Sequence, residues 1–126
     1  VFISHDLAAV ARATRDIVVM YGGDMVERGP TAEVLARPSH PYTRGLLAAR
    51  PSLSDTARDP DGRRRRLPTI PGTVPPLDAL PAGCRFSGRC PHELPRCATE
   101  RPAVRGIGPG RVAACHLTET ALEVPA

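Results

Sequence analysis

Four cysteines in the C-terminal part of the chain constrain its fold more than any other feature. Cys84, Cys90, Cys97 and Cys115 are separated by 5, 6 and 17 residues. The stretch that holds them has few large apolar side chains, and so short a stretch buries too little surface to order itself. We therefore expect a cross-link through these cysteines to order residues 83–126.

Three kinds of cross-link fit a set of four cysteines. Two disulfides are typical of secreted proteins, and we expect no secretory signal here. Structural zinc usually uses closely spaced C-x₂₋₄-C turns, and every gap here is wider. A [4Fe–4S] cluster spreads four thiolates further apart, so the spacing favours it slightly and leaves all three open. His92 or His116 could replace one cysteine ligand.

The composition narrows the possible functions. All 17 basic residues are Arg, which excludes a phosphate-binding G-x-x-x-x-G-K-[ST] loop and any lysine-based catalysis in this chain. The net charge of +4 is spread along the sequence, and with two Phe, two Tyr and no Trp there is little to stack on bases. We therefore expect no nucleic-acid partner. No apolar run is long enough to span a bilayer.

The first half of the chain has the clearest secondary-structure signals. Val1–Ser4 is an apolar run typical of a buried strand end, and Ser4 is an N-cap candidate for a helix that begins near Asp6. The apolar runs on either side of Gly22-Gly23 predict a β-hairpin. Two short helices are predicted next, with Thr31 as the cap of the first and Pro41 at the first position of the second.

The second half is rich in Pro and Arg and has little periodicity. We expect a linker over residues 51–82 with at most one short strand, near Leu67–Ile70. In residues 83–126, Gly83 and Gly88 are suited to shape the turns that aim the sulfurs. Cys115 lies in the apolar stretch 112–117, which predicts a short strand.

His5 is the other candidate functional residue. It lies between a predicted strand end and a predicted helix start, where open α/β sheets bind ligands and helix N–H groups favour anions. An imidazole there could contact a phosphate or position a water molecule. Taken alone, such a histidine is more often a capping or surface residue.

Longer stretches of the sequence, around His5 and further along the chain, help to interpret this histidine. Residues 1–7 and 16–29 resemble the switch-histidine segment and the following hairpin of ABC transporter ATPases. Residues 38–47 (PSHPYTRGLL), residues 71–75 (PGTVP) and the Cys-rich tail resemble the C-terminal region of oligopeptide/dipeptide ABC importer ATPases. The resemblance covers nearly the whole chain.

This resemblance implies roles for both sets of residues. His5 would be the switch histidine, which senses the γ-phosphate of ATP bound with Mg²⁺ and supports attack by water. The phosphate loop, the Walker B carboxylates and the signature motif match no position here, so we expect this chain alone to be inactive. Cys84, Cys90, Cys97 and Cys115 would hold a [4Fe–4S] cluster, with zinc as the alternative.

The resemblance also implies a domain organisation. The fold class would be α/β, with residues 1–50 ending an ABC-type nucleotide-binding domain, residues 51–82 a linker, and residues 83–126 an irregular, metal-stapled extension. The partners would be a second ABC ATPase subunit, transmembrane permease subunits and, indirectly, a peptide-binding protein, at the cytoplasmic face of the membrane. The alternative is an independent metal-stapled interaction module with no ATPase role.

Overall fold

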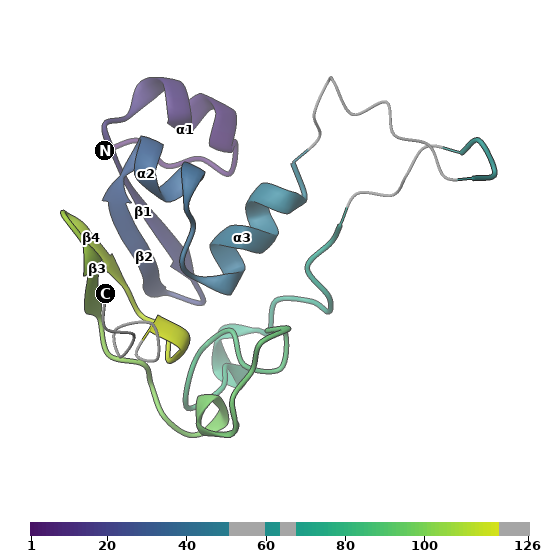
Figure 1. The fold of residues 1–126 in the computed structure, drawn as a ribbon. Helices are drawn as coiled ribbons and strands as arrows, with labels where there is room; N and C mark the ends of the chain where they lie inside the picture. Colours follow the sequence, from purple (N-terminus) through teal and green to yellow (C-terminus); the bar gives the residue numbers. More distant parts are fainter. Residues whose placement is uncertain (51–59, 64–67, 119–126) are drawn as a thin grey trace, which may run out of the picture.

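The computed structural model describes residues 1–50, 60–63 and 68–118. Its centre is an antiparallel sheet of order β1-β2-β4-β3, with helices beside it (Figure 1). The strands are β1 (Asp16–Tyr21), β2 (Asp24–Pro30), β3 (Arg105–Gly108) and β4 (Arg111–Ala113). The α-helices are α1 (Leu7–Ala13), α2 (Thr31–Ala36) and α3 (Pro41–Ala48), and the 3₁₀ helices are η1 (Leu77–Ala79) and η2 (Pro95–Ala98). Helices packed with a sheet agree with the predicted α/β class.

The hairpin predicted around the Gly-Gly pair is confirmed. β1 pairs with β2 in the register Tyr21 to Asp24 and Asp16 to Pro30. The turn places Gly22 and Gly23 at φ 57° and 84°. Positive φ at both central residues is what a tight two-residue hairpin turn needs, and glycine adopts it without strain.

The core joins the hairpin to the cysteine region. β1 alternates strictly, so that Ile17, Val19 and Tyr21 are buried on one face. Phe86, from the loop between the first two cysteines, is buried against the same face and meets the Tyr21 ring nearly edge-on at 5.1 Å between centroids. The centroid of the Tyr42 ring, in α3, lies 5.5 Å from the centroid of the Phe86 ring. One apolar cluster therefore orders both halves of the described chain.

Two helix starts differ from the sequence-based prediction. Asp6, not Ser4, is the N-cap of α1, because its carboxylate accepts from two N–H groups of the first turn. The Ser4 hydroxyl instead accepts from the Asp6 N–H. In α2 the N-cap is Pro30 and Thr31 is already helical, its hydroxyl 3.0 Å from that of Thr14. The prediction for α3 is confirmed, with its proline in the first turn.

The strand predicted at Val1–Ser4 is wrong, and the described part of the Leu67–Ile70 stretch, where at most one short strand was expected, forms none. Val1–Ser4 lies outside the sheet and is exposed, since no described strand runs beside it to satisfy its backbone. Pro68–Ile70 is not a strand either: Pro68 has no N–H to donate, and Ile70 packs against Gly45 of α3. Leu67, the rest of that predicted strand, lies outside the described residues, as do most of the linker residues.

The C-terminal extension contributes to the central sheet. β4 pairs with β2 through Glu27 to Ala113 and Arg28 to Val112, and β3 pairs with β4. The predicted irregular extension therefore supplies two of the four strands, and the strand predicted over residues 112–117 ends at Ala113, just before Cys115. The division at residues 50 and 82 stays a prediction. Within the described ranges, no helix has the length and apolar character to cross a membrane.

Candidate functional site

The first and third cysteines are held together by their own backbone. The Cys84 N–H donates to the Cys97 carbonyl at 2.8 Å, and the Gly83 N–H donates to the Ala98 carbonyl at 3.3 Å. A Cβ atom on Gly83 would lie only 2.8 Å from the Ala98 carbonyl carbon and 2.8 Å from the Glu100 nitrogen. The two segments can approach this closely only because residue 83 has no side chain.

The loop that carries Cys90 is closed by a carboxylate. Gly88 turns the chain at φ 80°. The Glu93 carboxylate accepts from the Gly88 N–H at 2.7 Å and from the Ser87 hydroxyl. These hydrogen bonds, that of Ser87 first, lower the pKa of Glu93. The carboxylate therefore stays ionised and holds both ends of the loop.

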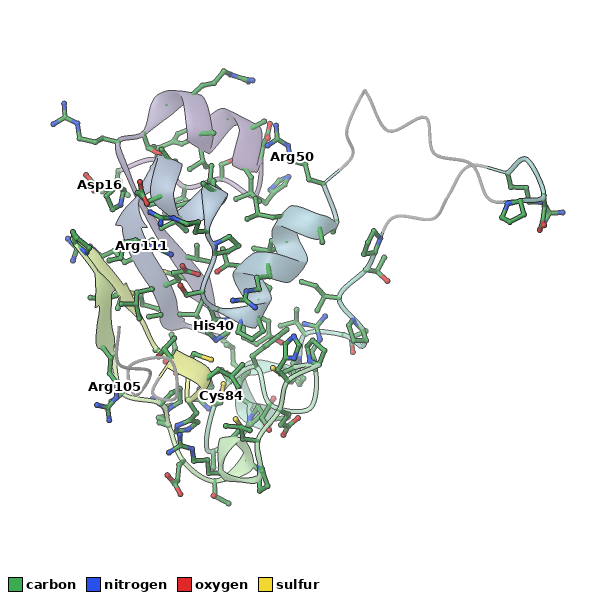
Figure 2. The ribbon with its side chains drawn as sticks, viewed as in Figure 1. Asp16, His40, Arg50, Cys84, Arg105 and Arg111 are labelled. Carbon is green, nitrogen blue, oxygen red and sulfur yellow. The ribbon has the colours of Figure 1, made fainter. Side chains whose placement is uncertain are left out.

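Cys115 shares an electrostatic environment with the other three cysteines. Burial raises its pKa to about 11, the Leu117 N–H opposes the rise, and the other three thiols add to it. Burial also raises the pKa of Cys84 and of Cys90, each of which is affected by neighbouring thiols. Figure 2 shows sulfur atoms gathered near Cys84, below the sheet. The fold thus brings the four predicted ligands to one region, although 17 residues separate the last two.

Backbone N–H groups favour the charged form of the cysteine sulfurs. The Leu94 N–H donates to the Cys97 sulfur at 3.4 Å, and the N–H groups that act on the other thiols are those of Phe86 and Ser87 for Cys84, His92 for Cys90 and Leu117 for Cys115. For Cys84, Cys90 and Cys115 these hydrogen bonds lower the pKa against the effect of burial. An N–H group favours a thiolate over a thiol, so the backbone is shaped to stabilise negative sulfur.

The described side chains do not form a finished metal site. No group of three or more His, Cys, Asp or Glu side chains in residues 1–50, 60–63 and 68–118 is arranged to hold a metal ion. The four cysteines are free thiols, and no disulfide joins them. The donor chemistry therefore fits a thiolate-bound centre, whereas the thiol positions are not those of bound ligands.

The arginines beside the cysteines bind carbonyl and hydroxyl oxygens. Arg89 donates to the Pro71 carbonyl at 2.8 Å, the Gly72 carbonyl at 3.1 Å and the Tyr21 hydroxyl at 2.9 Å. Arg85 donates to the Pro81 carbonyl and lies 3.4 Å from the Asp24 carboxylate. These guanidinium groups fasten loops to the core.

His116, a predicted substitute ligand, is held by a backbone carbonyl. Its side chain is buried, and Nε2 lies 3.0 Å from the Glu100 carbonyl oxygen. The Arg96 guanidinium donates to the His116 carbonyl at 3.3 Å. His116 therefore joins the end of β4 to the segment after Cys97. His92 is exposed.

His5 lies apart from the cysteines, just before α1. It is exposed, and within the described part of the chain its imidazole makes no hydrogen bond. Its neighbour Asp6 caps α1, and the N–H groups of Ala9 and Ala8 lower the Asp6 pKa. The carboxylate of Asp6 is thus committed to the helix, and the adjacent imidazole is available to an incoming group.

Sequence reasoning missed a buried charged group at the centre of the molecule. The Glu27 side chain is fully buried in β2 and accepts from the Arg111 guanidinium at 3.0 Å. It also accepts from the N–H groups of Ser39 and His40 at 2.9 and 3.0 Å. A charged residue in a hairpin strand is usually exposed, and the cationic partner of Glu27 is 84 residues away in the sequence, so no local pattern indicated the pair.

His40 is buried in the same place and stays neutral. Its Nδ1 accepts from the Tyr42 N–H at 3.0 Å, which caps α3. Burial lowers the pKa of His40 to about 4, although the Glu27 carboxylate opposes the shift. His40 therefore works as a helix cap, with its ring 5.9 Å from that of Phe86.

Comparison with known proteins gives one consistent result. Residues 26–97 match the sequence profile of the family described as the C-terminal region of oligopeptide/dipeptide transporters. A probable peptide ABC transporter ATP-binding protein of Sinorhizobium fredii is 44% identical over 90% of this chain, which corresponds to 32% of that protein. The dipeptide transport ATP-binding protein DppD of Escherichia coli is 42% identical over 92% of the chain and 33% of its own length.

A third relative agrees with the first two. The oligopeptide transport ATP-binding protein AppD of Bacillus subtilis is 39% identical over 93% of this chain and 34% of its own length. The chain therefore spans about a third of the length of the curated relatives that it matches.

Proposed function

This chain belongs to the family of oligopeptide/dipeptide transporter C-terminal regions, and we propose on that basis that it is part of the ATP-binding subunit of a peptide-importing ABC transporter. The observation that carries the proposal is similarity along 90% of the chain or more to ATP-binding proteins of peptide transporters. It disfavours an independent metal-stapled module, since the similarity extends through the hairpin as well as the Cys-rich tail.

In this proposal His5 is the switch histidine of the nucleotide site. Its exposed imidazole lies beside the start of α1, whose capping carboxylate is already occupied by N–H groups. An imidazole there can donate a hydrogen bond to the γ-phosphate of ATP and orient the attacking water. Mg²⁺ and the remaining catalytic groups come from the rest of the subunit.

The assembly follows from the same proposal. Two ATP-binding subunits pair around ATP and dock against transmembrane permease subunits at the cytoplasmic face of the membrane. A peptide-binding protein delivers the peptide and meets the permease rather than this chain. Nucleic acid is not a partner.

A chimera tests this function. In the Escherichia coli DppD subunit, the matching third would be replaced by residues 1–126 of this chain, and dipeptide uptake would be measured in cells lacking the native subunit. We expect uptake to be restored, and to be lost again with His5→Ala. A folded, membrane-assembled chimera that supports no uptake contradicts the proposal.

The four cysteines form the second part of the proposal. Cys84, Cys90, Cys97 and Cys115 would hold a [4Fe–4S] cluster, and zinc is the alternative on the same ligands. The support is the shared environment of the four thiols, the hydrogen bond from the Leu94 N–H to the Cys97 sulfur, and the backbone N–H groups that lower the pKa of the other three thiols against burial. When bound, the cluster would supply a structural cross-link for a region with little core of its own.

Metal analysis tests this second part directly. The full chain would be purified without oxygen, and iron, sulfide and zinc would be measured per chain together with the visible spectrum. We expect iron, sulfide and a coloured protein, all lost in Cys97→Ser. Met20→Ser removes an exposed sulfur outside the site and is the matched control. One zinc ion per chain without colour would mean that the centre is zinc and not a cluster. A metal-free wild-type chain would contradict the metal centre.

A further inference from the structure

A buried ion pair connects the N-terminal hairpin to the C-terminal strands. One Arg111 nitrogen donates to the Glu27 carboxylate at 3.0 Å, to the Ser39 hydroxyl at 3.1 Å and to the Arg37 carbonyl. The side chains of Arg111 and Glu27 are 9% and 0% exposed. Through these contacts Arg111 of β4 reaches across β2 to the end of α2 (Figure 2).

The Arg111 side chain reaches Glu27 across a glycine. The pairing of Glu27 with Ala113 and Arg28 with Val112 places Gly29 opposite Arg111. A Cβ atom on Gly29 would lie 2.8 Å from the Arg111 Cγ and 3.3 Å from a methyl group of Val34. Gly29 therefore leaves open the path that the guanidinium side chain takes.

The backbone alone defines this strand pairing weakly. β2 and β4 share two paired positions, extended by a hydrogen bond from the Ala114 N–H to the Val26 carbonyl at 2.9 Å. A slip by one residue moves a strand by about 3.3 Å and turns each side chain to the opposite face. Cys115 lies two residues beyond the end of β4, so such a slip would remove its sulfur from the other three.

The ion pair distinguishes the native register from one slipped by a single residue. In the native register Arg111 lies opposite Gly29 and its charge is matched by Glu27. After a slip, the arginine would meet a side chain and Glu27 would be buried without its cation, which is strongly unfavourable. A buried ion pair often adds little net stability, whereas fixing a register is its best-attested role.

We propose that the Glu27–Arg111 pair, with Gly29, fixes the register of β4 on β2 and thereby positions the Cys115 sulfur for the metal centre. The part concerning the metal rests on the proposed function of the cysteines. Glu27 and Arg111 are positioning residues: they set where Cys115 lies and do not bind the metal.

Residue-resolved thiol labelling tests the positioning without metal. The reduced, metal-free full chain would be alkylated under native conditions, and the rate at each cysteine would be read by mass spectrometry. In Glu27→Gln we expect Cys115 to react about tenfold faster, with Cys84 changed less than about twofold, because only the β2–β4 junction opens more readily. Glu33→Gln removes a carboxylate from an exposed ion pair and is the matched control.

A milder variant separates positioning from general stability. Arg111→Lys keeps the positive charge but loses the planar donor group. Even if Glu27→Gln unfolds the chain, this variant should therefore stay folded and keep part of the protection of Cys115 from alkylation. Equal acceleration at all four cysteines, or wild-type protection of Cys115 in both variants, overturns the proposal.

Metal loading distinguishes this proposal from the proposed function. If the wild type binds metal, Glu27→Gln should bind less than half as much, and unchanged loading overturns the positioning role. If the wild type binds no metal, the metal centre is wrong, while selective acceleration of Cys115 would still support the register role.

Discussion

The His5 segment and the cysteine region differ in how much of their geometry the described chain itself supplies. The segment Val1–His5 is exposed and makes few contacts with the rest of the molecule. Cys97 and Cys115, by contrast, are buried, and backbone hydrogen bonds, a closing carboxylate and a share of the core fix their surroundings. His5 thus needs groups from outside the described residues to complete its site, whereas the described chain itself positions the cysteines.

The largest effect should come from filling the closest contact in the cysteine region. Gly83→Ala places a methyl group against the backbone of Ala98 and Glu100, which cannot move aside as a flexible side chain could. We expect a loss of about 4 kcal/mol in the free energy of unfolding, measured by urea titration.

Gly106→Ala provides the control for this substitution. Gly106 lies in the edge strand β3, and a Cβ atom there would meet nothing within 4 Å. Its unfolding free energy should change by less than about 0.5 kcal/mol. Equal stability of the two variants would mean that the approach of Cys84 to Cys97 is not tight, and the contrast between the two regions would weaken.

The second effect is a dependence of stability on pH that arises from His40. Its pKa is about 4 in the folded chain, below the ordinary value of 6.5, because the ring is buried. Between these two pH values the unfolded chain binds a proton that the folded chain does not. Stability should therefore fall by about 3 kcal/mol as the pH drops through this window, and should show no loss from His40 above it.

Urea titrations across this pH range measure the effect, with His40→Asn as the comparison. Asparagine can still cap α3, but it does not titrate. The variant should be less stable at neutral pH and should lose less stability on acidification. The same slope in both proteins would assign the pH dependence to other groups.

The sequence predicted the parts of the fold that depend on neighbouring residues. The Gly22-Gly23 turn and the proline at the start of α3 were evident because each acts through its own backbone angles. The strand predicted at Val1–Ser4 was wrong because a strand depends on a partner that a local pattern does not reveal.

The candidate site shows the same limit. Four cysteines in a region with little core indicated a shared site, and the structure brings their thiols into one environment. The Glu27–Arg111 pair was not predictable, since its members are 84 residues apart and each looks like a surface residue in its own segment. Gly29, in β2, was not singled out either, although the lack of a side chain there gives Arg111 its path.

A smaller effect should follow from loosening the attachment of the cysteine loop. Arg89 contacts two carbonyls and the Tyr21 hydroxyl, and Arg89→Lys keeps the charge but can no longer reach all three. We expect Arg89→Lys to lower the free energy of unfolding by about 1.5 kcal/mol, measured by urea titration. Arg12→Lys, on the exposed face of α1, is the control and should change little. Similar effects of the two would mean that the Arg89 contacts do not hold the loop.

The smallest effect on stability should come from the residue with the largest proposed effect on activity. His5 is exposed and makes no hydrogen bond in the described part of the chain, so His5→Ala should change the unfolding free energy of the chain by less than about 0.5 kcal/mol. In the purified DppD chimera, the same substitution should lower ATP hydrolysis by about a hundredfold or more, because a group that stabilises the transferring phosphoryl would be lost. Ser4→Ala, next to it, removes only a hydrogen bond to the Asp6 N–H and should keep most of the activity. If the chimera hydrolyses ATP equally well with and without His5, then His5 does not act on the γ-phosphate.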